Sequence, residues 1–234
     1  MRRRVSHKSS KAPRSAVAPS SRPLHARGTL VIMAKQPVMG RVKTRLARQT
    51  SATEALRFYR NAVRTVASRL AADRRWRTVL AIAPDTAICA RVWPSRCAKV
   101  AQGRGDLGAR MQRLLELPAH GPVVLVGTDI PSITPAHIAA AFRLLGSHDV
   151  VFGPAADGGF WLVGLKRMPA LVRPFADIRW STADTLAESL ANCAGHRVAL
   201  ASTLSDVDDA ADLRRLGPTA ARFVPTRVNG AAGH

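Results

Sequence analysis

The stretch Leu30-Val-Ile-Met-Ala-Lys-Gln-Pro-Val-Met-Gly-Arg-Val-Lys-Thr-Arg-Leu46 decides the fold of this chain. Its apolar first part enters a loop broken by proline and glycine, and the loop then delivers Arg41, Lys43 and Arg45 within five residues. A strand that ends in a basic loop and opens a helix is a common phosphate site in α/β proteins, because backbone N–H groups and the helix N-terminus attract anions. The stretch therefore predicts an enzyme that acts on a nucleotide or another phosphorylated substrate.

The loop differs from a P-loop, because the sequence lacks the pattern G-x-x-x-x-G-K-[ST]. Gly40 permits unusual backbone angles or the close approach of a ligand. Lys43 and Arg45 lie on adjacent turns, where they can converge on one anion. Cations at a helix start oppose the positive end of the helix dipole. The arrangement is costly unless an anion binds there, which favours a phosphate site over a plain basic surface.

Length and composition narrow the class of protein. The 234 residues suffice for one domain with a sizeable core, and an apolar content of 47% is typical of a soluble globular protein. No window approaches the roughly 18 uninterrupted apolar residues that a membrane span needs. The three cysteines contain no C-x-x-C pair and the histidines no H-E-x-x-H or H-x-H cluster, which argues against a disulfide framework or a zinc site. A cytoplasmic location fits best.

The basic charge is concentrated at the N-terminus. The net charge of +21 falls to +13 without the eight Lys and Arg of residues 1–30, and the first acidic residue is Glu54. Residues 1–28 are rich in Ser, Pro, Ala and Arg without hydrophobic periodicity, so we expect a disordered basic tail. It could bind polyanions, target the protein to an organelle, result from a start codon placed too far upstream, or have no specific role.

Beyond the tail, strands and helices alternate, which predicts a three-layer α/β domain over residues 29–217 with a mostly parallel sheet. The short spacing of the fifth and sixth strands suggests an antiparallel excursion. Residues 218–234 are expected to fray. The expected strands are Thr29–Ala34, Thr78–Ala83, Lys99–Ala101, Val123–Val126, Val150–Phe152, Phe160–Val163 and Val198–Leu200. The expected helices span Lys43–Ala71, start at Asp106 and at Pro135, follow a capping box of Ser181 and Asp184, and surround Leu213.

Carboxylates at strand ends are the candidate metal ligands. Asp129 follows the most apolar strand, and ligands of open α/β sheets gather at the carboxyl ends of strands. A carboxylate there suits Mg²⁺, which commonly uses one or two protein carboxylates together with substrate phosphates; the alternative is an Asp that caps the turn before Pro131. Asp206 and Asp208 precede a short helix, where capping is the strong alternative to a metal role. Asp157 is a turn residue or a site residue.

A second glycine-rich loop, Gly103-Arg-Gly105-Asp-Leu-Gly108, matches G-x-G-x-x-G and opens a helix. The strand before it is weak, and no acidic residue follows at about 20 positions to bind a ribose, so it is a poor dinucleotide fingerprint. It remains a plausible nucleotide-contacting loop.

Taken together, these motifs show a resemblance to a known family. The chain resembles the bacterial glycosyltransferase-like proteins, linked in one branch to arsenosugar biosynthesis, of the nucleotide-diphospho-sugar transferase superfamily, which are related to molybdenum-cofactor and phospholactate guanylyltransferases. The resemblance runs from about residue 29 to residue 216. Its matching stretches are Ala34–Leu46, Gly105–Met111, Gly127-Thr-Asp-Ile-Pro131, Asp157-Gly-Gly-Phe-Trp-Leu-Val-Gly-Leu165, Trp180-Ser-Thr182 and Asp206-Val-Asp208.

The resemblance implies a GT-A-type fold with a mixed, mostly parallel sheet and helices on both faces. It implies that the basic loop contacts nucleotide phosphates, that the second glycine-rich loop lies near the base or ribose, and that the Asp157 turn borders the acceptor. Many relatives carry an acidic or Ser-Asp pair where this chain has Thr128-Asp129. The implied catalytic residues are Lys43, Arg45 and Asp129; the implied nucleotide contacts are Gly40, Arg41, Gly105, Leu107, Gly108, Asp157 and Gly158; and the implied ligands of Mg²⁺ or Mn²⁺ are Asp129, Asp206 and Asp208.

Two transfer reactions fit these residues. In the first, a small acceptor's hydroxyl attacks the sugar carbon of a nucleotide sugar; in the second, an acceptor phosphate attacks the α-phosphorus of a nucleoside triphosphate. Both build negative charge on phosphates that cations and a metal stabilise, and glycosyl transfer is the preferred interpretation. A non-enzymatic nucleic-acid binder is a weaker alternative, because the charge is diffuse, aromatic residues are only 5% and no nucleic-acid-binding motif is present.

Overall fold

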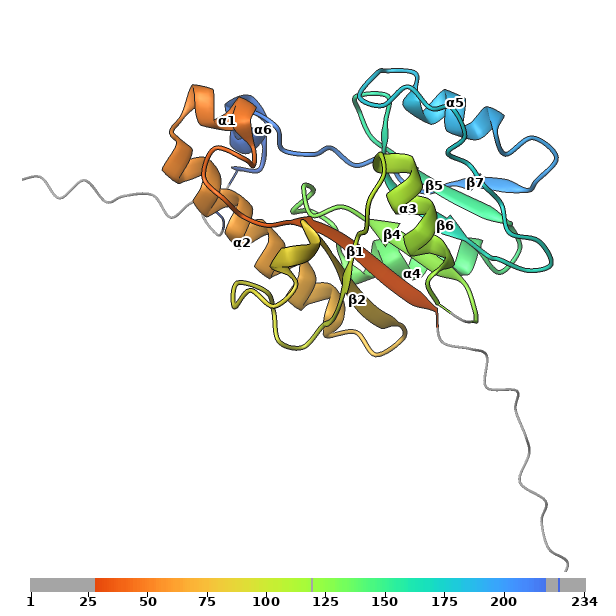
Figure 1. Ribbon diagram of the computed structural model, residues 1–234. Coiled ribbons are helices and arrows are strands. Elements are labelled where there is room, and N and C mark those ends of the chain that lie inside the picture. The colour runs from red at the N-terminus through yellow and green to blue at the C-terminus, as the bar shows by residue number, and fades with distance from the viewer. Residues whose placement is uncertain (1–27, 119, 218–222, 224–234) are drawn as a thin grey trace, which may run out of the picture.

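Strand β1 (Thr29–Lys35) lies between β2 and β4 inside a seven-stranded sheet with the strand order β3-β2-β1-β4-β6-β5-β7. The computed structural model describes residues 28–118, 120–217 and 223 (Figure 1). Among the described strands, β6 alone runs antiparallel to both of its neighbours, which confirms the expected excursion. The other strands are β2 (Arg77–Ala83), β3 (Ala98–Ala101), β4 (Val123–Val126), β5 (Val150–Pro154), β6 (Phe160–Leu165) and β7 (Val198–Leu200).

Helices cover both faces of the sheet. Alternate residues of β1 point to opposite sides, so Leu30 and Ile32 pack with helices α2 (Ala52–Ala71) and α4 (Pro135–Leu144), whereas Val31 packs with α3 (Leu107–Glu116) and α5 (Thr185–Ala191). Each apolar strand therefore buries both of its faces, as expected for a mostly parallel sheet. The predicted α/β class with helices on both faces is confirmed. No helix in the described part of the chain has the length and apolarity to cross a membrane.

Two helix predictions are wrong in detail. The expected helix Lys43–Ala71 is two helices, α1 (Thr44–Gln49) and α2, because the Ser51 hydroxyl accepts a hydrogen bond from the Glu54 N–H and starts a new helix. The Ser181 capping box does not form, since Ser181 has a positive φ of 63° and α5 starts after Asp184. The break after α1 lets the basic loop turn independently of the long helix.

A separate apolar cluster joins α1 and α2 to helix α6 (Ala210–Arg215). Figure 1 shows α6 beside α1. The Ala210 N–H donates to the Gln49 side chain at 2.8 Å, which connects the start of α6 to the end of α1. Phe223 is buried against Phe58 at a ring separation of 6.0 Å. This packing brings the segment before α6 next to the basic loop. The predicted tails, 1–28 and 218–234, lie outside the described residues except for Gly28 and Phe223.

Candidate functional site

Two adjoining hollows lie at the carboxyl ends of β1 and β4, and Lys35, Tyr59 and Asp129 line both of them. The smaller, of about 280 Å³, we call the cationic hollow; the larger, of about 370 Å³, we call the aromatic hollow. This is the edge at which ligands of open α/β sheets bind. The cationic hollow is also lined by Arg41, Val42, Lys43, Thr44, Arg45 and Asp208. The described residues that distinguish the aromatic hollow include Gln102, Leu107, Met111, Asp157, Phe160, Trp161, Trp180, Ser181, Thr182 and Asp206.

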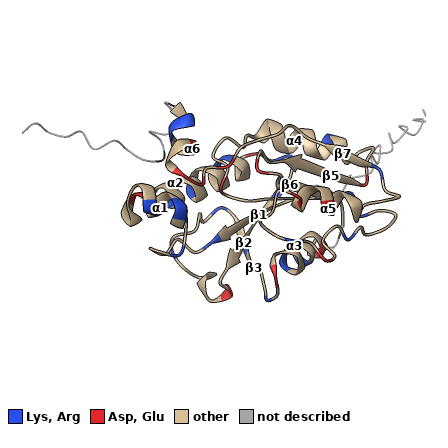
Figure 2. Ribbon diagram, turned by 90° about the horizontal axis from the view of Figure 1, so that it is seen from above, with Lys and Arg blue, Asp and Glu red and all other residues tan. Residues whose placement is uncertain are grey.

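Lys43 is the centre of the cationic hollow. Its Nζ lies 2.7 Å from Asp208 Oδ1 and 3.1 Å from Asp129 Oδ1, and its side chain is only 6% exposed. The backbone of Lys43 adopts a left-handed conformation with φ of 46°, which is uncommon for a residue with a side chain. Because Lys43 directly precedes α1 in this conformation, its ammonium group turns inward while α1 carries Arg45 on its exposed side. Figure 2 marks the basic residues of α1 in blue and the acidic residues near α6 in red.

Burial and neighbouring charges raise the pKa values of two residues of the site, Lys43 and Asp206. Burial alone would lower the pKa of Lys43, but the carboxylates of Asp129 and Asp208 outweigh it and raise the pKa above the ordinary value. Burial raises the pKa of Asp206, and the nearby carboxylates of Asp208 and Asp157 raise it further. Lys43 is therefore firmly cationic at neutral pH, within a surplus of negative charge.

The structure changes the electrostatic argument made from the sequence. Helix α1 has only six residues, and carboxylates of the protein itself compensate the cations at its start. Arg45 NH1 lies 3.6 Å from Asp208 Oδ2, and the Arg45 side chain is 76% exposed. Three cations at this helix start are therefore less costly without a bound anion than the sequence indicated, because Asp129 and Asp208 satisfy Lys43. The arginines remain available to an incoming phosphate.

The structure decides whether Asp206 and Asp208 cap helix α6 and whether Asp157 holds its turn. The cap of α6 is Asp209, whose side chain accepts from the backbone N–H groups of Ala211 and Asp212, so Asp206 and Asp208 do not cap this helix. Asp157 does hold its turn, since its Oδ1 accepts from the Gly159 N–H at 3.0 Å.

Glycine at three predicted contact positions is explained by packing. A Cβ on Gly108 would lie 2.9 Å from the Trp180 ring, and a Cβ on Gly158 would lie 2.2 Å from the Ala183 carbonyl oxygen. A Cβ on Gly105 would come within 3.0 Å of Ala109. None of the three, nor Gly40, is among the described residues that line the two hollows. Leu107 does line the aromatic hollow.

Sequence reasoning missed several lining residues. The Tyr59 hydroxyl accepts a hydrogen bond from the Lys35 N–H at 2.8 Å, and burial followed by the charge of Asp129 raises the pKa of Tyr59 to about 12. Gln102 is buried, and its Nε2 donates to the Ala34 and Ala81 carbonyls of β1 and β2. Tyr59 is a buried residue of α2, and a hydroxyl among the apolar residues of this helix was a usable signal.

The donor set suits a divalent cation that substrate phosphates complete. Asp129 Oδ1 is a buried carboxylate oxygen 3.1 Å from Lys43 Nζ, and Asp208 stands across Lys43 Nζ from it. Two carboxylates plus phosphate oxygens are a common ligand set for Mg²⁺. Within the described residues no group of three or more His, Cys, Asp or Glu side chains could hold a metal by itself. The predicted ligands Asp129, Asp206 and Asp208 therefore do not form a preassembled trio, and their metal role stays a prediction.

Comparison with protein families gives one match, to a bacterial family described as "Uncharacterized protein conserved in bacteria (DUF2064)", over residues 65–182, half of the chain. The chain belongs to this family. The part shared with DUF2064 includes Asp129, Asp157 and Trp180, whereas the basic loop and the Asp206–Asp208 segment lie outside it. None of the curated proteins matches the sequence.

Solved structures extend the comparison. A provisionally assigned nucleotide-diphospho-sugar transferase from Desulfovibrio desulfuricans G20 is 27% identical, with a TM-score of 0.76, over 86% of this chain and 92% of that one. A nucleotidyl transferase from Methanothermobacter thermautotroptrophicus is 13% identical, with a TM-score of 0.53, over 84% and 98% of the two chains. A 4-diphosphocytidyl-2C-methyl-D-erythritol synthase from Anaerococcus prevotii is 10% identical, with a TM-score of 0.52, over 80% and 95%. The latter two share the fold. The arsenosugar and guanylyltransferase links stay predictions.

Proposed function

We propose that this protein is a metal-dependent transferase that uses a nucleotide-activated donor, and that it transfers a glycosyl group to a small acceptor. One observation carries the proposal: a cationic hollow and an aromatic hollow adjoin at the carboxyl ends of parallel strands and share Lys35, Tyr59 and Asp129. A donor that spans both hollows would place its phosphates among the cations. Its transferred group would then lie among the carboxylates and aromatic rings. The 27% identity to the provisionally assigned sugar transferase supports the same assignment.

The cations act on the leaving group. Lys43 is buried and held by two carboxylates, so its ammonium is positioned before the substrate arrives. Arg41 and Arg45 line the same hollow, where they would bind the outer phosphate oxygens. Such preorganised charge lowers the barrier because it stabilises the charge that develops during bond cleavage. A divalent cation held by Asp129 and Asp208 would supply further charge neutralisation on the diphosphate.

The proposed step is a substitution at the sugar carbon. The acceptor hydroxyl oxygen forms a bond to the anomeric carbon while the bond from that carbon to the diphosphate oxygen breaks. The electron pair of the broken bond leaves on the nucleoside diphosphate, whose added charge Lys43 and Arg45 stabilise. The hydroxyl proton passes to an acidic side chain of the aromatic hollow or to water.

Nucleotidyl transfer is the second candidate, because the same cations would serve a triphosphate whose α-phosphorus is attacked. Its products differ, since pyrophosphate is released in place of a nucleoside diphosphate. The test is to incubate the full chain with a panel of sugar nucleotides and, separately, with nucleoside triphosphates, each with Mg²⁺ or with EDTA. We expect metal-dependent release of nucleoside diphosphate from one of the sugar nucleotides. Release of pyrophosphate would replace the first candidate by the second, and metal-dependent binding of neither donor would refute the enzyme assignment.

A further inference from the structure

We infer that the acceptor is a hydroxyl compound with a flat apolar face and no phosphate or carboxylate group, bound in the aromatic hollow against Phe160 and Trp180. This inference rests on the proposed function, because it names the acceptor of that same site. It separates the two candidate reactions, since nucleotidyl transfer to a phosphorylated acceptor requires an anion at this position.

The charge of the aromatic hollow disfavours an anionic acceptor. Its described lining includes three carboxylates, from Asp129, Asp157 and Asp206, and one cation, Lys35. Lys35 also lines the cationic hollow, where the donor phosphates are proposed to bind. Lys43 pairs with Asp129, but no cation of the described residues pairs with Asp157 or Asp206, so a phosphate group beside these two would face like charges.

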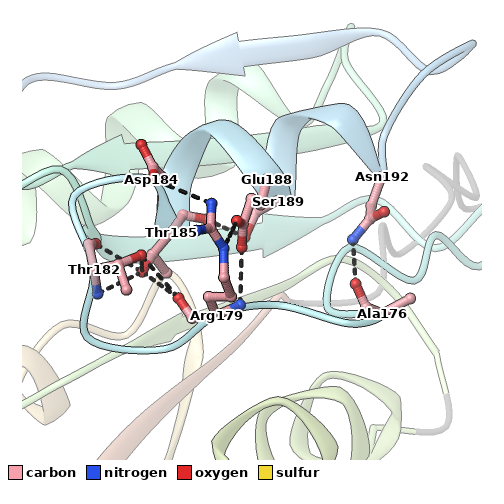
Figure 3. A network of polar contacts seen from close by, with 8 residues as sticks. All are labelled: Ala176, Arg179, Thr182, Asp184, Thr185, Glu188, Ser189 and Asn192. Atoms are coloured by element: carbon pink, nitrogen blue, oxygen red, sulfur yellow. Dashed lines mark hydrogen bonds and ion pairs between the residues drawn. The ribbon is translucent and has the colours of Figure 1, made fainter.

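The arginine next to Trp180 is paired with carboxylates. Arg179 precedes Trp180, but its guanidinium contacts Glu188 Oε1 at 2.5 Å and Asp184 Oδ2 at 3.1 Å (Figure 3). Its backbone N–H donates to Glu188 Oε2 at 2.8 Å. Both acidic partners belong to α5 or its cap, so the charge of Arg179 is neutralised at this helix.

Aromatic rings give the hollow an apolar wall. Phe160 stacks on Phe175 with an interplanar angle of 12° and a centroid separation of 6.0 Å. Trp180 packs edge-on to Phe160 at 6.5 Å and tilted to Phe175 at 5.9 Å. Of these rings, Phe160 and Trp180 line the hollow. Aromatic faces beside hydroxyl groups suit a ring that is apolar on one side and hydroxylated at its edge.

The wall is held in place before any ligand binds. At one end, Asn192 Nδ2 donates to the Ala176 carbonyl at 2.7 Å, and at the other the Thr185 hydroxyl donates to the carbonyls of Arg179 and Thr182 (Figure 3). The turn at Gly158 is tied to the first turn of α5, since the Gly158 carbonyl accepts from the Leu186 N–H at 3.0 Å. A rigid wall loses little entropy on binding, which makes its selectivity a property of fixed groups.

The experiment uses a matched pair of probes, phenyl β-glucoside and phenyl β-glucoside 6-phosphate, which share a ring and hydroxyl groups and differ in charge. Each is titrated into the full chain with Mg²⁺ and UDP or GDP present, and binding is followed by tryptophan fluorescence. Beforehand, calorimetry establishes whether UDP or GDP binds. We expect the neutral probe to bind on the order of tenfold more tightly, as repulsion between like charges at a half-exposed site predicts.

Substitutions test whether the carboxylate charge causes the preference for the neutral probe. Asp157→Asn keeps the oxygen that holds the turn and removes the charge, so it should reduce the preference for the neutral probe to about twofold to threefold. Asp177→Asn, outside the lining of the hollow, is the control and should leave the preference unchanged. Trp180→Phe should weaken both probes equally, because it alters the wall and no charge.

The outcomes distinguish a failure of the inference on the acceptor from a failure of the proposed function. Tighter binding of the phosphorylated probe, equal binding of the two, or binding of neither while the nucleotide binds would overturn the inference on the acceptor and leave the nucleotide site intact. Absence of nucleotide binding with Mg²⁺ would overturn the proposed function, and the acceptor inference with it.

Discussion

Replacing Lys43 by methionine should uncouple the nucleotide affinity of the site from its metal affinity. Methionine keeps an unbranched stem of similar length in the buried position and removes the ammonium that stands between Asp129 and Asp208. Without it the two carboxylates lose their shared cation, and Asp208 keeps only the more distant Arg45, at 3.6 Å, among the described residues. The variant should bind a nucleoside diphosphate more weakly, because a cation for the phosphates is lost, and should bind Mn²⁺ alone more tightly, because both carboxylates become free.

The magnitudes follow from burial. Removing one partner of a fully buried ion pair costs about 3–5 kcal/mol. Here the Asp129 and Asp208 side chains are 51% and 41% exposed, so water solvates the freed charges and a loss of about 1–2 kcal/mol is expected, or roughly 2–8 °C in Tm. A hydrogen bond to a charged group contributes about 1.5–3 kcal/mol, which predicts a loss of about 10–150-fold in diphosphate affinity. Since the pKa of Lys43 is raised, the stability difference should persist at neutral pH and fade only as the pH rises above the ordinary value of 10.5.

Three measurements check the predicted affinities and stability of Lys43→Met. Calorimetry gives the affinity for UDP and GDP with Mg²⁺, electron paramagnetic resonance gives free Mn²⁺ without nucleotide, and thermal melting gives stability. Lys99→Met is the matched control, because Lys99 is on β3 and does not line either hollow among the described residues. The reasoning is refuted if Lys43→Met keeps diphosphate affinity within about twofold of wild type, or if Mn²⁺ binds no more tightly than before.

The remaining predictions concern the turn, the half-buried carboxylate and the metal. Gly158→Ala, with φ of +86° and a Cβ 2.2 Å from a backbone oxygen, should lower stability by about 2–4 kcal/mol in denaturant melts. Gly195→Ala has a similar φ of +83° with no described atom within 4 Å and should cost about 1–2 kcal/mol, so equal losses would discount the clash. Asp206→Asn should melt above wild type at neutral pH and level with it below about pH 4, because a carboxyl whose folded pKa is raised loses stability as pH rises through that pKa; a parallel pH profile would contradict this. Removing divalent cations with EDTA should lower UDP or GDP affinity at least about tenfold in calorimetry, and an unchanged affinity would contradict the metal role.

The strands could be predicted well from the sequence, because the apolar run that forms a strand is contained in a few neighbouring residues. The apolar run that forms β1 and the Thr134-Pro135 start of α4 are recognisable from a few residues. The helix break at Ser51 was missed, since Ser51 also fits the interior of a long amphipathic pattern and only the hydrogen bond to Glu54 identifies it as a cap.

The candidate site was predictable only where its residues belong to local motifs. The basic loop and the strand-end Asp129 were visible, but the partner of Lys43 is Asp208, which lies 165 positions away in the sequence. Only the packing of α1 against α6 brings them together. The aromatic wall was equally hidden, because Phe160 and Phe175 come from different segments and meet only in the folded chain.

The central claim is that a donor diphosphate binds in the cationic hollow with a divalent cation beside it. A crystal structure of the full chain with Mn²⁺ and whichever of UDP or GDP binds tests this most directly. The account predicts a diphosphate oxygen within hydrogen-bond distance of Lys43 Nζ and an anomalous Mn²⁺ peak on Asp129. A diphosphate bound elsewhere, or one in the cationic hollow with no Mn²⁺ on Asp129, would contradict it.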